Sequence, residues 1–387
     1  MRFSKKEAIS IICLSAFLFC IFMGGIAVAE KLTFQTRLNI QGEYFDNVTF
    51  ERLNPQEDYL MSIEPSFSLG YQTEKFDLGS RAWFDLGRYA NETVKDQENQ
   101  EYSINANYRF SERTSINGGF SYRRDSTQDT QLLETGEIAP FQDRIQYSGQ
   151  GGIYFSFSEL TSIGLNYNYL KREYSESYGT DYEQNSISLS FNRNFNDGLD
   201  TLTFQPTYYR QTMDYGELDY YSASIGWTHR VSERFQINAY LGGRKEKQKY
   251  GDLELDSDGI IANISIQRSY IGGAFSLGYN QDLHREVGGG QTEVKRLFCQ
   301  VDKQVLPRFG MGFYGSIYHR KEPSGPSDDY TIYYEVRPRL YYMLTEKQVL
   351  EMGYSYANSY DSTFTQDRSV ERNAIWIALK LVYDNIL

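Results

Sequence analysis

Apolar and polar residues alternate along nearly the whole chain after residue 30, in runs separated by short polar stretches. Every second residue from Tyr102 to Phe110 is apolar, and the same pattern resumes at Ile116. Alternation with a period of two predicts β-strands with one apolar and one polar face. The tetrapeptide between the two runs, Ser-Glu-Arg-Thr at 111–114, predicts a tight hairpin turn.

Similar turns recur along the chain, so the predicted repeating unit is a hairpin. Their predicted centres lie near residues 73, 112, 159, 197, 233, 268, 305 and 346. Eight short turns imply about eighteen strands of about ten residues. The connections at the other end are expected to be longer, roughly ten to twenty residues. The longest of them, residues 123–143, is expected to narrow the interior.

This arrangement predicts an all-β fold: a transmembrane antiparallel up-and-down β-barrel with short periplasmic turns and longer extracellular loops. A soluble β-propeller is the alternative, but its sheets are buried on both faces, and its strands would lack a Ser/Asn/Gly face. The apolar parity is expected to face lipid and the polar parity to face the lumen. Two interfacial aromatic belts are predicted: Phe76, Phe110, Phe157, Phe235, Phe309 and Tyr342 beside the short turns, and Tyr44, Tyr122, Tyr169, Tyr174, Tyr182, Tyr220 and Tyr250 beside the long loops.

Two features interrupt the pattern. Pro65, Pro206 and Pro338 lie inside predicted strands, where each is expected to mark a bulge or a local break. The run 292–301 has apolar residues on both parities, so its orientation stays open.

Residues 1–29 differ from the rest and predict a secretory signal peptide, which leaves 30–387 as the barrel domain. A basic start precedes an apolar run from Ala8 to Ala27, and the segment ends Ala27-Val28-Ala29. An uncleaved helical anchor is the alternative. Cleavage near Ala29 would direct the chain to the outer membrane of a Gram-negative bacterium.

Composition narrows the function classes. Residues 1–29 carry a net charge of +2, so their removal changes the formal charge from −12 to −14. An acidic chain is unsuited to nucleic-acid binding, which needs a basic surface. Cys299 alone remains after cleavage, which excludes an internal disulfide or a cysteine metal site. The three histidines have no metal-ligand or catalytic spacing, so we expect no enzyme, metal or cofactor.

The polar parity supplies the candidate functional residues. Small polar side chains dominate it, and ionisable ones punctuate it. Charges of both signs could select solutes through a transverse field or could pair across strands to fix the register. The candidate lumen-lining residues are Arg37, Glu64, Arg81, Asp85, Asn105, Asn107, Arg109, Asn166, Asn168, Glu335, Arg337, Arg339 and Glu351.

The recurrent Ser-Glu-Arg turns, the Tyr/Ser/Asn strands and the ending Arg372-Asn373-Ala374-Ile375-Trp376-Ile377 resemble the beta-barrel porin 2 family of Gram-negative outer membranes. The resemblance covers nearly all of residues 30–387 and implies a link to extracellular polysaccharide export. The chain departs from the usual barrel ending, since it closes with Leu387 and lacks a terminal Phe.

The main prediction is therefore a conduit that exports an extracellular or capsular polysaccharide. The alternatives are a general diffusion porin for small hydrophilic solutes and a structural or adhesive surface barrel. Expected partners are outer-membrane lipid and lipopolysaccharide, together with the polysaccharide and periplasmic export components for the main prediction.

Overall fold

The computed structural model describes residues 31–91, 94–176, 178–321, 329–362 and 369–386, so the predicted signal peptide lies outside the described residues. The strands are β1 (Lys31–Phe45), β2 (Asp58–Gln72), β3 (Phe76–Tyr89), β4 (Gln97–Arg109), β5 (Thr114–Ser126), β6 (Asp143–Ser158), β7 (Thr161–Tyr174), β8 (Tyr182–Phe195), β9 (Asp200–Met213), β10 (Gly216–Ser232), β11 (Phe235–Tyr250), β12 (Leu253–Tyr270), β13 (Gly273–Arg285), β14 (Gln291–Leu306), β15 (Phe309–Lys321), β16 (Thr331–Thr345), β17 (Gln348–Asp361) and β18 (Ser369–Ile386). One α-helix, α2 (Thr127–Thr135), and one 3₁₀ turn, η1 (Asn196–Gly198), complete the elements.

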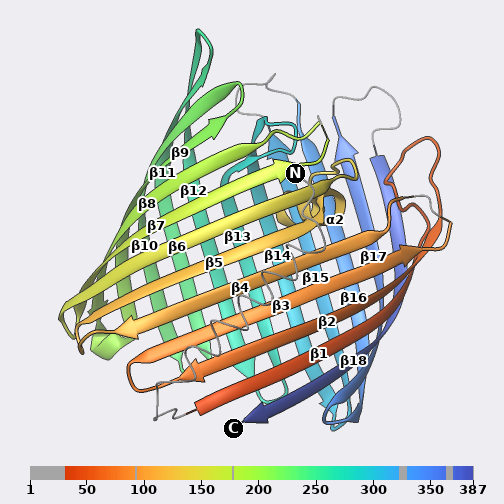
Figure 1. Cartoon of the computed structure of the whole chain (residues 1–387), viewed down its shortest axis with the longest axis horizontal. Helices are drawn as coiled ribbons and strands as arrows, with labels where there is room; N and C mark the ends of the chain where they lie inside the picture. The colour runs from red at the N-terminus through yellow and green to blue at the C-terminus, as the bar shows by residue number, and fades with distance from the viewer. Residues whose placement is uncertain (1–30, 92–93, 177, 322–328, 363–368, 387) are drawn as a thin grey trace, which may run out of the picture.

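The eighteen strands form one closed antiparallel barrel, which confirms the predicted fold class (Figure 1). Each strand pairs with its neighbours in sequence, and β18 returns to pair with β1 from Thr33↔Ile386 to Phe45↔Ala374. Closure leaves the sheet without a free edge along this seam. No helix of the described residues is long and apolar enough to cross a membrane.

The two parities separate as the alternation predicts. Along β8 the exposed and less exposed residues alternate from Tyr182 to Phe195, with Ile187, Leu189 and Phe191 on the outer face. Outward aliphatic and aromatic side chains recur on the other strands and form an apolar band, which suits hydrocarbon. In the run with two apolar parities, Leu297 and Cys299 share the outer face with Leu277 and Tyr279, so Phe298 faces inward.

The aromatic belt beside the long loops is only partly as predicted. Tyr122, a predicted member, belongs to a row of ring contacts with Phe84, Tyr102 and Tyr147 of neighbouring strands, with centroids 5.3–6.0 Å apart. Other members of the predicted belt lie inside the barrel instead. Tyr182 and Tyr220 are 6% and 4% exposed, because both follow the inward parity of their strands.

Two of the predicted long loops are tight turns. β9 and β10 are joined by residues 214–215, and β11 and β12 by residues 251–252. Here the strands continue as hairpins that project beyond the rest of the rim (Figure 1). Exposed cross-strand ion pairs occur along the projection, where Lys245 lies 3.6 Å from Asp256 and Lys249 lies 3.8 Å from Glu254.

Two of the short turns lie a few residues beyond their predicted centres near 268 and 305. The first is at Ile271-Gly272, where Gly272 has φ 77°, and the second is at Pro307-Arg308. A left-handed backbone favours glycine, and proline cannot continue a ladder, so these residues set the turns.

Each of the three strand prolines breaks one ladder without shifting its register. Pro65 is paired with Leu38 of β1, but the β2–β3 pairing is interrupted between Ile63 and Ser66. Pro206 and Pro338 behave in the same way, with breaks toward β8 and β17. The missing N–H of proline accounts for the one-sided break, and no extra residue is inserted.

Candidate functional site

The connection between β5 and β6 folds into the barrel and places α2 across its interior (Figure 1). The helix ends at Gly136, whose φ of 71° is left-handed and whose N–H donates to the carbonyl oxygen of Leu132 over 3.0 Å. A Cβ at this position would lie 2.8 Å from Cβ of Tyr318. Both the turn and the close approach to the wall therefore require glycine.

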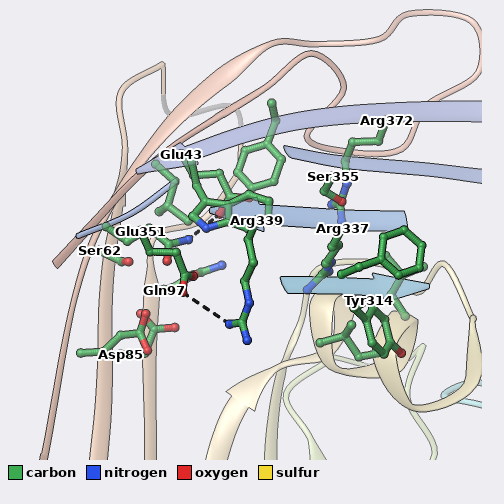
Figure 2. A pocket seen from close by; sticks show the side chains of 18 of the residues that line it. Glu43, Ser62, Asp85, Gln97, Tyr314, Arg337, Arg339, Glu351, Ser355 and Arg372 are labelled. Atoms are coloured by element: carbon green, nitrogen blue, oxygen red, sulfur yellow. Dashed lines mark hydrogen bonds and ion pairs between the residues drawn. The ribbon is translucent and has the colours of Figure 1, made fainter. Parts of the chain in front are cut away.

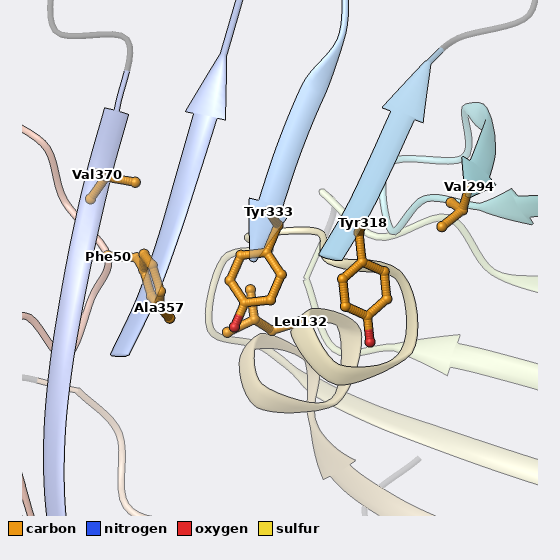
Figure 3. Close-up of a cluster of buried hydrophobic side chains, with 7 residues drawn as sticks. All are labelled: Phe50, Leu132, Val294, Tyr318, Tyr333, Ala357 and Val370. Carbon is orange, nitrogen blue, oxygen red and sulfur yellow. The ribbon is translucent and has the colours of Figure 1, made fainter. Parts of the chain in front are cut away.

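Apolar contacts attach α2 to the wall formed by β14–β18. Leu132, Tyr318 and Tyr333 are 1%, 0% and 0% exposed and belong to one buried cluster (Figure 3). The hydroxyl of Tyr318 donates to the carbonyl oxygen of Leu133 over 2.6 Å. The other members of the cluster are Phe50, Val294, Ala357 and Val370. These contacts give the helix a fixed seat on the wall.

Polar anchors hold the rest of the connection. Arg144 and Asp125 form a buried bidentate pair, with Nε–Oδ1 2.9 Å and Nη2–Oδ2 2.8 Å. Glu137 accepts the backbone N–H of Val287 over 3.2 Å. Burial raises the pKa of Glu137 to about 7; Glu286 also raises it, whereas Arg320 and the Val287 N–H lower it. Residues 127–142, which include α2 and Glu137, are here called the plug. Their position inside the barrel agrees with the expectation that this connection narrows the interior.

Beside the plug lies a cavity of about 500 Å³, called the central cavity, which has carboxylates and guanidiniums in its wall (Figure 2). Five of the predicted candidates line it: Glu64 and Asp85 from β2 and β3, and Arg337, Arg339 and Glu351 from β16 and β17. Leu132 and Leu133 of the plug contribute an apolar side. The charged lining residues are Glu43, Glu64, Asp85, Asp302 and Glu351 against Arg337, Arg339 and Arg372.

The arginines on β16 are ion-paired and also partly open to the lumen. Arg337 Nε lies 2.5 Å from Oε1 of Glu335, which is 1% exposed and also accepts the hydroxyl of Ser355. Arg339 pairs with Asp302 and, over 3.4 Å, with Oε2 of Glu351. The side chains of Arg337 and Arg339 are still 34% and 33% exposed. Pairing and contact with solutes are therefore compatible for these two residues.

The remaining candidates lie away from the central cavity. Arg81, Asn105 and Asn107 line two further cavities of about 530 and 620 Å³ near the short-turn end, Arg81 in the first, Asn107 in the second and Asn105 in both. Arg37, Arg109, Asn166 and Asn168 lie on inward-facing positions but line none of these three cavities. Asn166 accepts the hydroxyl of Tyr154 over 2.7 Å.

Sequence reasoning missed several groups that line the central cavity or contact its lining residues. Asp302 belongs to the strand whose parity stayed open, and Lys380, which lies 2.8 Å from Glu351, follows the inward parity of the last strand. Lys380 and Glu43 lie on inward positions of their strands, so the alternation of apolar and polar residues could have identified both. No period-two pattern could have found Leu132 and Leu133, because they reach the cavity from a helix in a connection. Among the described residues, no group of three or more His, Cys, Asp or Glu is placed to hold a metal ion.

No protein-family model matches the chain, and no curated protein matches it. Solved structures do. They include the FrpB iron transporter from Neisseria meningitidis, with TM-score 0.52, 10% identity, and coverage of 89% of this chain and 65% of that one. OccK1 of Pseudomonas aeruginosa gives TM-score 0.51 and 12% identity over 92% of this chain and 100% of that one. OpdL of the same organism gives TM-score 0.50 and 12% identity over 91% of this chain and 99% of that one.

The chain thus spans somewhat less than two thirds of FrpB and nearly the whole of OccK1 and OpdL. At these identities the likeness concerns the fold. The resemblance to the beta-barrel porin 2 family rests on the sequence features alone. The chain has the β-barrel fold of outer-membrane channels and transporters.

Proposed function

We propose that this barrel is a passive channel through which small hydrophilic solutes cross the outer membrane. The observation that carries the proposal is a polar lumen interrupted by a plug. Cavities of about 500 to 620 Å³ lie along the inward parity, lined mostly by polar side chains. Hydrophilic solutes can exchange hydrogen bonds with water for hydrogen bonds with such walls.

The plug limits the size of the solutes that can pass through the barrel. α2 is held by buried apolar contacts and by Glu134, whose Oε2 lies 3.7 Å from Nη1 of the buried Arg144, so its displacement has a large energetic cost. A long glycan would need this segment to leave the lumen. The comparisons also give no support to polysaccharide export, so the diffusion channel is the better proposal.

The charged central cavity gives the proposed channel a preference. Acidic lining residues outnumber basic ones, five to three. Such an excess raises the local concentration of cations and lowers that of anions. We therefore propose weak cation selectivity, with the outward apolar band in contact with lipid and lipopolysaccharide.

Two measurements on one preparation test the proposal. Purified barrel in planar bilayers is expected to give ohmic conductance with weak cation selectivity. Liposomes that contain it are expected to swell in monosaccharides and amino acids but not in long oligosaccharides. A barrel that conducts nothing in bilayers, or that passes oligosaccharides as fast as monosaccharides, contradicts the proposal. Loss of a surface glycan in a deletion strain, with unchanged solute uptake, would favour the export prediction instead.

A further inference from the structure

A smaller cavity of about 220 Å³ lies on another face of α2, and it differs from the central cavity in its chemistry. It is called the arginine pocket here. Its wall combines Gln131 of α2, Arg172 of β7, Tyr182 of β8, Gln211 of β9, Arg285 of β13 and Gln291 of β14. The pocket therefore joins the plug to two separate parts of the barrel wall.

The arginine pocket contains buried hydrogen-bond donors that have no acceptor. Nε and Nη2 of Arg285 and Nε2 of Gln131, Gln211 and Gln291 lack any hydrogen-bond partner among the described residues. Gln131 and Gln211 are 1% and 3% exposed. Buried polar atoms in folded proteins are nearly always satisfied. Five unmet donors in one small pocket indicate that an acceptor-rich group belongs there.

The charged side chains around the arginine pocket also favour an anion. Two guanidiniums approach the ring of Tyr182, with Cζ of Arg172 5.8 Å and Cζ of Arg285 5.7 Å from its centroid. Glu134 is the carboxylate of the lining, and it already lies 3.7 Å from Arg144 and 3.8 Å from Arg172. Arg285 forms no ion pair within the described chain, and its Nη1 donates to the carbonyl oxygen of Gly289 over 2.6 Å, which fixes the guanidinium.

The geometry points to a binding site for a small oxyanion, a phosphate-type or carboxylate group whose oxygens accept from Arg285, Gln211 and Gln291. The volume is below the roughly 300–1,000 Å³ of pockets for drug-sized ligands, which restricts the occupant to a group of few atoms. Because Gln131 belongs to α2, a bound anion also ties the plug to β9, β13 and β14. This inference does not depend on which solutes cross the barrel.

Isothermal titration calorimetry of the folded full chain in detergent tests the site. Sodium phosphate, sulfate and acetate are titrated separately at constant ionic strength, so that the arms distinguish a phosphate-type from a carboxylate occupant. Saturable binding of at least one anion is expected. Arg285→Gln should weaken it by about tenfold or more, because a charge-assisted hydrogen bond is lost. Gln211→Glu, which is isosteric but adds a negative charge, should abolish it.

Lys171→Gln is the matched control, because it removes one positive charge from the neighbour of Arg172 but outside the pocket. The Lys171→Gln variant should bind the anion with the same affinity as the wild type. If none of the three anions binds saturably to folded wild-type barrel, the donors hold water only and the inference is wrong. It is also wrong if affinity is unchanged in either folded variant. Should Arg285→Gln fail to fold, Gln211→Glu decides alone.

Discussion

Arg244 of β11 reaches Glu293 of β14 past two intervening strands, with Nη2 3.1 Å from Oε2. The contact crosses a split in the wall. β12 and β13 pair only from Ala262↔Gln281 to Tyr270↔Gly273, whereas β11–β12 and β13–β14 continue beyond that point. The guanidinium fills the split against Gly259, where a Cβ would lie 2.4 Å from Cζ. Arg244 thus closes the wall where the backbone ladder ends.

Removal of this arginine is expected to destabilise the barrel. Arg244→Met leaves the carboxylate of Glu246, 2% exposed, without its partner at 3.0 Å. Loss of one member of a buried ion pair costs roughly 3–5 kcal/mol. The variant should therefore unfold at lower temperature in a heat-modifiability assay on gels. Lys245→Met, at an exposed neighbouring position, should change stability by less than about 0.5 kcal/mol. Equal unfolding of the two variants would contradict the closing role.

The two faces of the strands should differ in their tolerance of charge. Leu189 and Ile225 are 38% and 59% exposed on the outer face, and a charge at the midplane of this face costs roughly 2–4 kcal/mol. Leu189→Arg and Ile225→Lys should therefore impair assembly, while Ser188→Arg and Ser224→Lys should fold. Heat-modifiable folding in detergent is measured for all four variants. If the outward-facing variants fold as well as the inward-facing ones, the assignment of the two faces is wrong.

The arginines of the central cavity should influence ion selectivity. Arg337→Gln with Arg339→Gln removes two positive charges from a cavity that already has an acidic excess. The ratio of cation to anion permeability should rise, as measured by reversal potentials in a salt gradient. Arg308→Gln, in an exposed short turn, is the control and should leave the ratio unchanged. An unchanged ratio in the double variant would assign these arginines to structural pairing only.

The apolar seat of the plug should control conductance. Leu132→Ala removes a buried side chain from the cluster with Tyr318 and Tyr333, which costs about 2–5 kcal/mol in a packed core. Because the loss falls on docking of α2, single-channel conductance should rise or fluctuate between two levels. Leu160, 45% exposed in the short turn between β6 and β7, supplies the control Leu160→Ala, which should leave conductance unchanged. Identical conductance of Leu132→Ala and wild type would show that the plug is held by other contacts.

The plug should also respond to pH. Glu137 has a pKa of about 7 in the docked plug, above its ordinary value of 4.5, so the docked state binds the proton more tightly. Docking is therefore strongest below about pH 4.5 and weakens by at most about 3 kcal/mol as the pH rises through about 7. Conductance should therefore increase between about pH 4.5 and 7 and level off above about pH 7, where the docked and undocked states have both lost the proton. Glu137→Gln should remove this dependence, and Glu134→Gln should retain it; a pH response that persists in Glu137→Gln would exclude this carboxyl as its source.

The sequence predicted the barrel well because period two is a local property of each strand. Tyr102 to Phe110 and its counterparts suffice to place strands, faces and most short turns. The turn at Ile271-Gly272 lies beyond its predicted centre because a polar tetrapeptide precedes it, whereas the left-handed φ of Gly272 is what sets the turn. The sequence predicts long loops around residues 214–215 and 251–252 because the ends of the flanking strands are polar.

The plug and the arginine pocket could not be predicted in this way. α2 has only nine residues, and Leu132 is buried by side chains that lie far away in the sequence. Likewise, Arg172 and Gln211 lie on inward positions that look like many others in the sequence, whereas Arg285, at the end of β13, has the parity of the outer face and is not expected in the interior. Such groups converge only through closure of the barrel and the path of one connection.

Leu133 and Tyr318 are 185 residues apart, which constrains the order of assembly. α2 follows the fifth strand, but its seat is built from β14–β18, the last part of the chain to be synthesised. Contacts across such a separation form late, after the long intervening segment has been ordered. An assembly intermediate that lacks the final strands therefore has no seat for its plug. The plug can therefore reach its complete docking position only after the last strands are in place.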